Sequence, residues 1–258
     1  MLIQVNDVEH TFRTPKGESV VAINGLSFHV NQGEFVSILG PSGCGKTTTL
    51  RMMDGLLRPT GGHIIINGKI VERPGYDRAM VFQDSGLFPW RTTLENVEMG
   101  LEFQRRSRAE RSEKVRSMID LVGLQGFERS YPHQLSGGMR QRVGLARAFA
   151  IDPNIFLMDE PFGALDAQTR EIMQEELLRL WGNFHRTVVF ITHSIDEAIY
   201  LSDRVIIMSA RPGRVKLELP IPIKRPRWQT DVKATREFSE LRTEAWSVLK
   251  SEITAIKR

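Results

Sequence analysis

A glycine-rich stretch at residues 40–47, GPSGCGKT, follows the apolar run 35–39, FVSIL, without a break. It fits the pattern G-x-x-x-x-G-K-[ST], in which a strand precedes the loop and a helix follows it. Glycines let the backbone N–H groups converge on one anion, and the positive end of the following helix lies behind them. The stretch therefore predicts a strand–loop–helix unit that binds the β- and γ-phosphates of a nucleotide.

The side chains of this loop have separate predicted roles. Lys46 would bridge the β- and γ-phosphates, and the Thr47 hydroxyl would ligate Mg²⁺. Cys44 fills a free position of the pattern and is expected only to fit there. The residues predicted to bind the nucleotide from this segment are Gly40, Pro41, Ser42, Gly43, Cys44, Gly45, Lys46, Thr47 and Thr48.

Two adjacent carboxylates end a second apolar run, 155–159, IFLMD, where Asp159 is followed by Glu160. Neighbouring carboxylates repel each other unless a cation lies near them. Asp159 at the end of a buried strand can hold Mg²⁺ through water, and Glu160 would then face the γ-phosphate and orient or deprotonate the attacking water. A solvated strand end is the alternative for the pair taken alone, and the phosphate loop favours the catalytic interpretation.

Two further polar residues follow apolar runs. Gln83 comes after residues 79–82, AMVF, and His193 comes after residues 187–192, TVVFIT, just before a predicted capping box of Ser194 and Glu197. Parallel α/β folds bind ligands at the carboxyl ends of their strands, so both side chains can converge on one phosphate. Taken alone, His193 is more typical of a surface residue or of a satisfied hydrogen-bond partner, and Gln83 by itself is a weak signal.

A second anion site is predicted within residues 134–148, QLSGGMRQRVGLARA. Ser136, Gly137 and Gly138 begin a helix whose N-terminal N–H groups would bind an anion with no base, metal or lysine attached. One chain with two phosphate-binding helix starts and one set of acids suggests that two copies share each nucleotide. A glycine-rich helix start without a ligand is the alternative.

Strand-like and helix-like segments alternate along the chain. The runs 35–39, 155–159, 187–192 and 204–209 are typical of strands buried on both faces. Residues 108–122 follow a capping box of Ser107 and Glu110 and are predicted to be helical. This alternation predicts an α/β fold with a mostly parallel sheet wrapped by helices.

Other segments differ from this pattern. Residues 1–30 and 61–71 are predicted to form short antiparallel strands, and residues 91–150 are predicted to be almost wholly helical. Prolines recur from Pro212 to Pro226, which predicts an extended link. A terminal helix follows, and its apolar face is expected to pack on the chain's own surface through Phe238, Leu241, Ala245, Leu249 and Ile256.

The length of 258 residues and the composition favour one domain with smaller appended units. No stretch reaches the roughly 18–20 uncharged apolar residues of a membrane-spanning helix, and the start lacks the regions of a signal peptide, so a cytoplasmic protein is expected. The one cysteine cannot form an internal disulfide, which agrees with a reducing compartment. With 35 basic and 31 acidic residues, the net charge of +4 does not indicate which class of partner the protein binds.

In their order along the chain, these motifs resemble those of the ATP-binding-cassette (ABC) ATPases, and the resemblance covers essentially the whole chain. Residues 40–47 resemble the Walker A loop, 81–84 the Q-loop with Gln83, 135–139 the signature motif, 155–160 Walker B, 163–166 the D-loop with Asp166, and 191–194 the switch histidine segment with His193. Phe12, 28 residues before Gly40, matches the aromatic residue that stacks on adenine in this family. Met139 replaces the glutamine of the commonest signature, which leaves the serine and glycine contacts intact.

The resemblance implies a P-loop NTPase (RecA-like) core with an antiparallel β-subdomain and an inserted α-helical subdomain. It assigns residues 1–90 and 150–210 to the core with its β-subdomain, 91–149 to the helical subdomain with the signature, and 211–258 to a C-terminal link and helix. The implied cofactors are ATP and Mg²⁺, with Thr47, Gln83 and Asp159 as metal ligands. The implied catalytic residues are Glu160, His193, Lys46 and Gln83.

The resemblance also implies a head-to-tail dimer with a second copy or a paralogue. The residues implied to contact the ATP of the other subunit are Leu135, Ser136, Gly137, Gly138 and Met139. In this family a cytoplasmic helix of a permease sits in the groove between core and helical subdomain, and residues 84–97 would line that groove. Ordinary packing within the helical subdomain is the alternative for Phe88, Pro89 and Trp90.

Residues 73–90, 161–170 and 210–215 look most like ATPase subunits of bacterial importers for nitrate, sulfonates, taurine and related small anions. The expected protein then lies on the cytoplasmic face of the inner membrane, with integral-membrane permease subunits and a periplasmic or extracellular solute-binding protein as partners and no nucleic acid. The alternative is an ABC-type ATPase that acts on nucleic acid or ribosomes. Only 53 positions separate Gln83 from Ser136, which leaves no room for the long coiled-coil insertion usual in that class.

Overall fold

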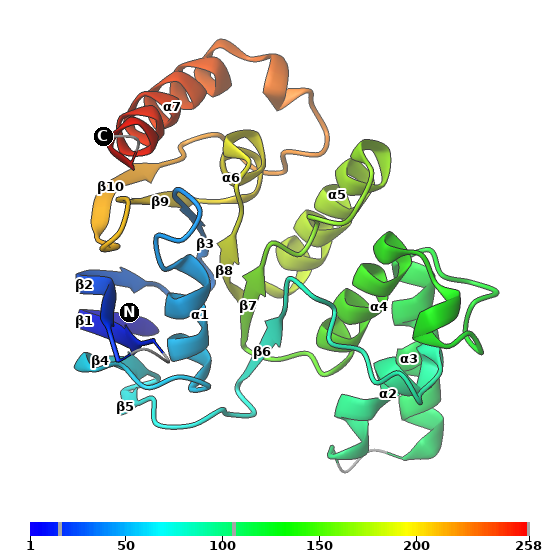
Figure 1. Cartoon of the computed structure of the whole chain (residues 1–258). Helices are drawn as coiled ribbons and strands as arrows, with labels where there is room; N and C mark the ends of the chain where they lie inside the picture. Colours follow the sequence, from blue (N-terminus) through cyan, green and yellow to red (C-terminus); the bar gives the residue numbers. More distant parts are fainter. Residues whose placement is uncertain (15–16, 105–106, 257–258) are drawn as a thin grey trace.

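The computed structural model describes residues 1–14, 17–104 and 107–256. Its central element is a six-stranded sheet in the order β10-β9-β3-β8-β7-β6, parallel except for the antiparallel edge strand β10 (Figure 1). The strands predicted at 35–39, 155–159, 187–192 and 204–209 are all present in this sheet. Its strands are β3 (Phe35–Leu39), β6 (Arg78–Val81), β7 (Ile155–Asp159), β8 (Thr187–Ile191), β9 (Arg204–Met208) and β10 (Val215–Pro220).

Both faces of this sheet are covered. Every residue of β3, β7 and β8 is buried, as expected for parallel strands between helical layers. Because side chains alternate across a strand, Phe35 and Leu39 belong to one apolar core, whereas Val36 and Ile38 belong to the other. The predicted α/β fold with a mostly parallel sheet is therefore confirmed.

A second sheet packs on the core that contains α1 (Lys46–Asp54). It is antiparallel, as predicted, in the order β2-β1-β4-β5. Two of its strands are longer than the short strands expected, because β1 has 11 residues and β2 has 12, with register shifts along their pairing. Its strands are β1 (Ile3–Arg13), β2 (Ser19–Val30), β4 (Gly61–Ile66) and β5 (Lys69–Ile70).

Three helices lie side by side at the end of the molecule away from the antiparallel sheet (Figure 1). They are α2 (Thr93–Glu102), α3 (Arg108–Leu121) and α4 (Gly137–Ala150), with a short 3-10 turn at Pro132–Gln134. The predicted capping box of Ser107 and Glu110 is present at the start of α3. The sheet is also covered by α5 (Ala167–Phe184) and α6 (Ile195–Leu201).

Only one of the two hydrogen bonds of the predicted capping box of Ser194 and Glu197 is present. The Ser194 side chain accepts a hydrogen bond from Glu197 N, as a cap should. The Glu197 carboxylate instead accepts hydrogen bonds from the Thr192 hydroxyl and from Gln174 Nε2. Two donors held by the tertiary structure thus replace the local backbone partner of this buried acid.

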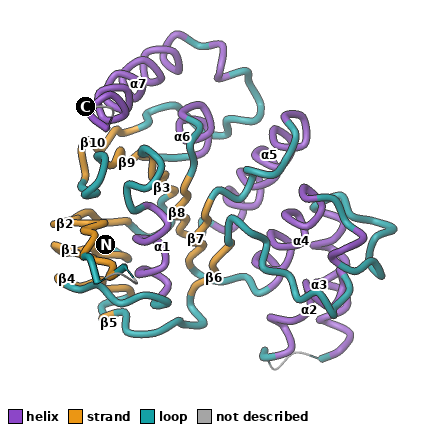
Figure 2. The backbone as a smooth tube through the Cα atoms, in the orientation of Figure 1, coloured by secondary structure: helices purple, strands orange, loops and turns teal. Residues whose placement is uncertain are grey.

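The C-terminal segment returns over the sheet (Figure 2). Residues 215–220 of the expected extended link pair with β9 as the edge strand β10, and a 3-10 turn (Val232–Ala234) precedes α7 (Arg236–Ile256). The α7 residues Phe238, Leu241, Ala245 and Leu249 are buried, which confirms packing on the chain's own surface. The side chain of Ile256 lies outside the described residues. Within the ranges given above, every helix is too short or too polar to cross a bilayer.

Candidate nucleotide site

The loop between β3 and α1 has the backbone geometry that its glycines predict. Gly45 is the N-cap of α1 with φ of 104°, and Gly43 has φ of 77°. Both values lie in the left-handed region that favours glycine. A Cβ at Gly45 would lie 2.8 Å from Ile23 Cγ1, so a larger residue would also collide with β2. The loop therefore depends on glycine for its conformation and for its fit against the antiparallel sheet.

Lys46 lies inside this loop rather than in solvent. Its side chain donates hydrogen bonds to Gly40 O at 2.8 Å and Pro41 O at 3.0 Å, and the residue is only 5% exposed. The ammonium group is thus held by the carbonyls at the start of the loop. This arrangement places a fixed positive charge at the floor of the loop.

Cys44 is buried beneath the same loop. Its thiol lies 3.9 Å from Lys46 Nζ, and a Cβ at Gly40 would lie 2.7 Å from Cys44 Sγ. Burial raises the pKa of the Cys44 thiol, with the nearby lysine opposing that shift. The thiol therefore stays protonated and serves to fill space under the backbone.

The Thr47 hydroxyl and the Asp159 carboxylate meet beside the loop. Thr47 Oγ1 donates to Asp159 Oδ1 at 3.1 Å, although the residues are 112 positions apart. Burial raises the pKa of Asp159, the Thr47 hydrogen bond lowers it, and the charge of Glu160 raises it further. Two adjacent oxygen donors, one of them an acid whose charge is disfavoured by burial, fit a hard cation such as Mg²⁺. Across the described ranges no cluster of three or more His, Cys, Asp or Glu forms a separate metal site.

Two side chains from neighbouring strand ends contact the carboxylate of Glu160, which itself follows β7. His193 Nε2, after β8, lies within hydrogen-bond distance of Glu160 Oε1, and Gln83 Nε2, after β6, donates to Glu160 Oε2 at 3.3 Å. Glu160 itself has φ of 48°, an unusual value for a non-glycine residue. Such strain is concentrated at functional sites. The structure thus brings Gln83 and His193, which are predicted to converge on one phosphate, together at the Glu160 carboxylate.

These residues line one cavity of about 520 Å³ above the loop. Phe12, at 43% exposure, contributes one wall, and its ring packs edge-to-face on His10 with 4.5 Å between ring centroids. A ring that is half exposed at the rim of a phosphate-binding cavity can stack on a base. The predicted residues that line the cavity are Phe12, Ser42, Gly43, Gly45, Lys46, Thr47, Thr48, Gln83, Glu160 and His193.

Comparison with known proteins decides the family. The family model described as "ABC transporter" matches residues 23–163. A taurine import ATP-binding protein of Pelagibacter ubique is 48% identical over 82% of this chain and 80% of its own length, and a nitrate import ATP-binding protein of Synechocystis is 43% identical over 98% and 97%. The chain belongs to the ABC transporter ATP-binding family. This protein is therefore an ATP-binding ABC ATPase with the P-loop NTPase fold.

A solved structure supports the same conclusion. It is a dimeric ATP-binding cassette in a post-hydrolysis state, bound to ADP and phosphate. It is 34% identical to the ABC ATPase described here, with a TM-score of 0.79, over 86% of this chain and all of the other. The fold and the ATPase chemistry thus agree between sequence and structure comparisons.

The predicted signature segment of the ABC ATPase lies at the start of α4, outside the residues that line the nucleotide cavity. Ser136 is the N-cap, and its side chain accepts from Met139 N at 3.2 Å. Gly138 faces the predicted D-loop, because a Cβ there would lie 3.3 Å from Leu165 Cδ2. Asp166 in turn caps α5 by accepting from Thr169 N at 2.9 Å. Within one chain, the signature and the D-loop therefore contact each other, and neither is among the residues that line the nucleotide cavity.

Sequence reasoning missed Arg211, which also lines the cavity. Its guanidinium donates to Gly43 O from Nε at 3.3 Å and from Nη2 at 3.2 Å. The residue lies between β9 and β10, 168 positions from the loop it contacts. Residues 210–215 carry part of the family resemblance, and no local pattern indicates their contact with the phosphate loop.

Hydrogen bonds among buried polar groups support the backbone on either side of His193. Ser194 N donates to Thr192 Oγ1 at 3.0 Å, and the Thr192 hydroxyl donates to the Glu197 carboxylate. Burial raises the pKa of Glu197, while its two hydrogen bonds lower it. These contacts position the backbone of His193, so that its ring reaches Glu160.

Proposed function

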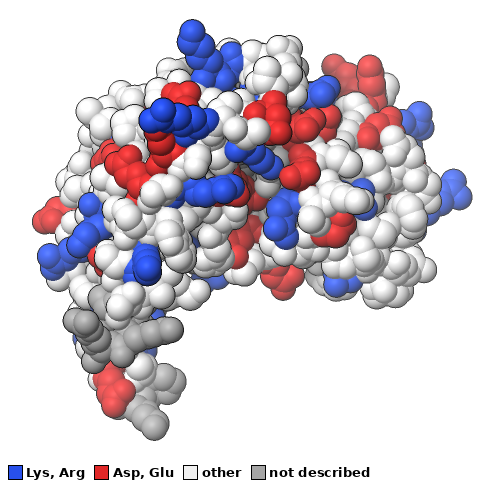
Figure 3. Space-filling model, turned by 90° about the horizontal axis from the view of Figure 1, so that it is seen from above, with Lys and Arg blue, Asp and Glu red and all other residues white. Residues whose placement is uncertain are grey.

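We propose that this ABC ATPase is the ATP-hydrolysing subunit of a bacterial importer for a small anion such as taurine, another sulfonate or nitrate. The observation that carries the proposal is the convergence of Gln83, Glu160 and His193 beside the phosphate loop. The taurine and nitrate import names of relatives that match most of the chain support the choice of importer. Lysine and arginine are interspersed with acidic side chains over the face in Figure 3, unlike the basic stripe typical of a nucleic-acid-binding protein.

The proposed chemistry is in-line attack of water on the γ-phosphate of ATP. Lys46 and the loop N–H groups bind the β- and γ-phosphates, and Phe12 stacks on adenine. Thr47, Asp159 and Gln83 would hold Mg²⁺, which would neutralise charge on the phosphate oxygens. The Glu160 carboxylate orients the water and accepts its proton, and His193 positions Glu160 and the γ-phosphate.

The completed site needs a second copy of the chain or a close paralogue. The signature residues lie away from the nucleotide cavity of their own chain, which leaves their helix N-terminus free to contact the ATP of a partner. The dimeric state of the solved relative supports this arrangement. Loss of the γ-phosphate contacts then opens the dimer, which couples hydrolysis to movement. In this scheme residues 1–90 with 150–210 act as the core, 91–149 as the helical subdomain and 211–258 as an appended segment.

Permease subunits are the proposed partners on the cytoplasmic face of the membrane, together with a periplasmic or extracellular solute-binding protein. A groove of about 290 Å³ between α1, β6 and α2 is the proposed binding surface for a permease helix. Phe82, Met99 and Ile151 line it, whereas Phe88, Pro89 and Trp90 do not, although Trp90 is 70% exposed. The proposed groove therefore includes none of the residues 84–97 that the sequence indicated, although Phe82 and Met99 flank that segment.

The variant Glu160→Gln tests the proposed chemistry. It keeps the shape of the side chain but removes the proton acceptor, so ATP turnover should fall about 10²–10⁴-fold. ATP-bound dimers should accumulate and be visible by size-exclusion chromatography. Glu113→Gln, on the exposed face of α3, is the matched control and should behave as wild type. Retained turnover in Glu160→Gln would remove Glu160 as the base.

The import function needs a separate measurement. Uptake of labelled taurine and nitrate is compared in a strain that lacks this protein and carries either the wild-type gene or Glu160→Gln. Restored uptake of one anion by the wild type alone is the expected result. Unchanged uptake of both anions, with co-purification of nucleic acid or ribosomes instead of a membrane protein, would favour an ABC-type ATPase that acts on nucleic acid or ribosomes.

A further inference from the structure

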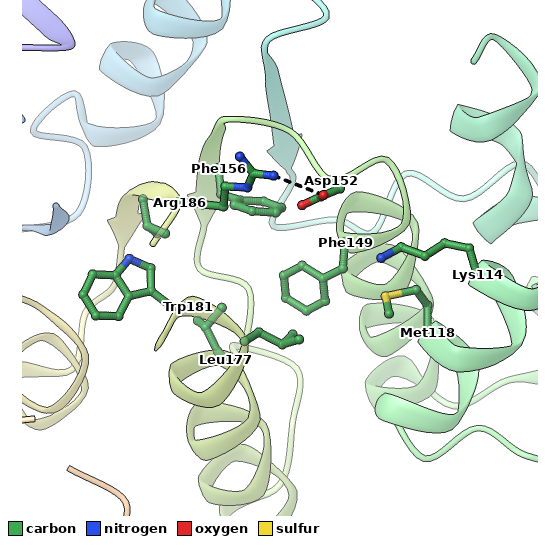
Figure 4. A pocket seen from close by; sticks show the side chains of 10 residues that line it. Lys114, Met118, Phe149, Asp152, Phe156, Leu177, Trp181 and Arg186 are labelled. Atoms are coloured by element: carbon green, nitrogen blue, oxygen red, sulfur yellow. Dashed lines mark hydrogen bonds and ion pairs between the residues drawn. The ribbon is translucent and has the colours of Figure 1, made fainter. Parts of the chain in front are cut away.

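A second cavity lies between the helical segment and the core of the protein (Figure 4). It has a volume of about 270 Å³ and shares no lining residue with the nucleotide cavity. Helices α3 and α4 form one wall, and α5, β7 and β8 form the other. Its lining residues are Lys114, Met118, Phe149, Asp152, Phe156, Leu177, Leu180, Trp181, Arg186 and Val188.

The walls of this cavity are mainly apolar and aromatic. The rings of Phe149 and Phe156 pack edge-to-face with 5.5 Å between centroids. Trp181 adds a third ring, and Leu177 and Met118 add aliphatic surface. An engineered cavity of about 150 Å³ binds benzene, so the larger volume here is enough for an aromatic ring with a short side chain.

The polar groups on the lining have an excess of donors and positive charge. Arg186 pairs with Asp152 at 3.1 Å, which neutralises the one carboxylate of the lining. The half-buried Lys114 extends from α3 toward the Phe149 ring, and it has no ion-pair partner in the described part of the chain (Figure 4). A half-buried cation without an ion-pair partner beside apolar walls favours a ligand that carries an anionic group.

We propose that this cavity binds a small organic anion that consists of one aromatic ring and one carboxylate. The ring lies among Phe149, Phe156 and Trp181, and the carboxylate is held by Lys114 at the rim. A bound molecule of this kind contacts both the C-terminal end of α4 and the core. Because Phe149 lies near the end of the helix that begins at Ser136, the ligand fixes the signature segment relative to the core. This regulatory consequence rests on the proposed dimeric ATPase, whereas the binding itself does not.

Calorimetry on the full chain without nucleotide tests the binding. The probes are 3-phenylpropanoate and its neutral analogue 3-phenylpropan-1-ol. The carboxylate should bind about five- to tenfold more tightly than the alcohol, the value of one charge-assisted contact at a half-buried site. Lys114→Gln should abolish this difference, whereas Arg116→Gln, an exposed neighbour on the same helix, should preserve it. Leu180→Trp, which fills the cavity, should abolish the binding of both probes.

Three results would overturn the proposal: no binding of 3-phenylpropanoate at millimolar concentration, equal affinity for the two probes, or wild-type affinity in both Lys114→Gln and Leu180→Trp. ATP turnover is measured separately with and without the probe. A change in turnover that Leu180→Trp abolishes supports the regulatory consequence. A chain that binds the probe but does not hydrolyse ATP would contradict the proposed function and leave the binding site standing.

Discussion

The guanidinium of Arg227 is the most completely buried charge in the C-terminal link, at 1% exposure. Its Nη1 donates to the last carbonyls of the α6 region, at 2.9 Å to Ile199 O, 3.0 Å to Tyr200 O and 2.7 Å to Ser202 O. Its Nη2 donates to Ile223 O at 3.0 Å. One cation therefore satisfies the carbonyl end of α6 and joins it to the link, at the helix terminus where positive charge is favourable.

Arg227→Met keeps the aliphatic stem and removes the donors. Burial lowers the pKa of Arg227 to about 10, so replacing the charge relieves part of a desolvation cost. Against this, the carbonyls of Ile199, Tyr200 and Ser202 lose their donor, at about 1–3 kcal/mol for each buried group. We expect the balance to reduce the free energy of unfolding by about 3–5 kcal/mol, within the range for breaking a buried charged network.

Urea unfolding followed by circular dichroism measures this change, and the melting temperature should fall by roughly 2–4 °C per kcal/mol. Arg236→Met is the matched control, because Arg236 is exposed and forms only an i,i+4 pair with Glu240. That pair contributes less than about 0.5 kcal/mol. A loss below about 1 kcal/mol in Arg227→Met, or an equal loss in both variants, would refute the reasoning.

Three further outcomes test the nucleotide site. Lys46→Ala should weaken ATP binding about 100-fold by loss of a charge-assisted phosphate contact, and unchanged affinity in equilibrium dialysis would contradict the loop assignment. Phe12→Ala should weaken ATP binding about tenfold through loss of base stacking, with inorganic triphosphate binding unaffected; equal losses for both ligands would argue against stacking. In mixed dimers, Ser136→Ala in one subunit should impair hydrolysis of the ATP on the phosphate loop of the other, and an effect confined to its own loop would exclude a shared site.

The sequence by itself determined the features whose causes are local. Glycines at positions 43 and 45 are needed for left-handed backbone, and Ser107 with Glu110 closes a capping box with neighbours in the chain. The convergence of Gln83 and His193 on one place was also predictable, because the carboxyl ends of parallel strands share one edge of the sheet.

Only the tertiary structure decided which distant groups complete these local units. Arg211 donates a hydrogen bond to Gly43 O, which is 168 positions away in the sequence. The Glu197 carboxylate does not close the predicted capping box and instead accepts hydrogen bonds from Thr192 and from a side chain of α5. Lys114 lies at a cavity that exists only where helices of separate segments meet the core. A buried polar group takes whichever partner the packed structure brings within hydrogen-bond distance, since leaving it unpaired is costly. That partner can lie anywhere in the chain, and no local pattern names it.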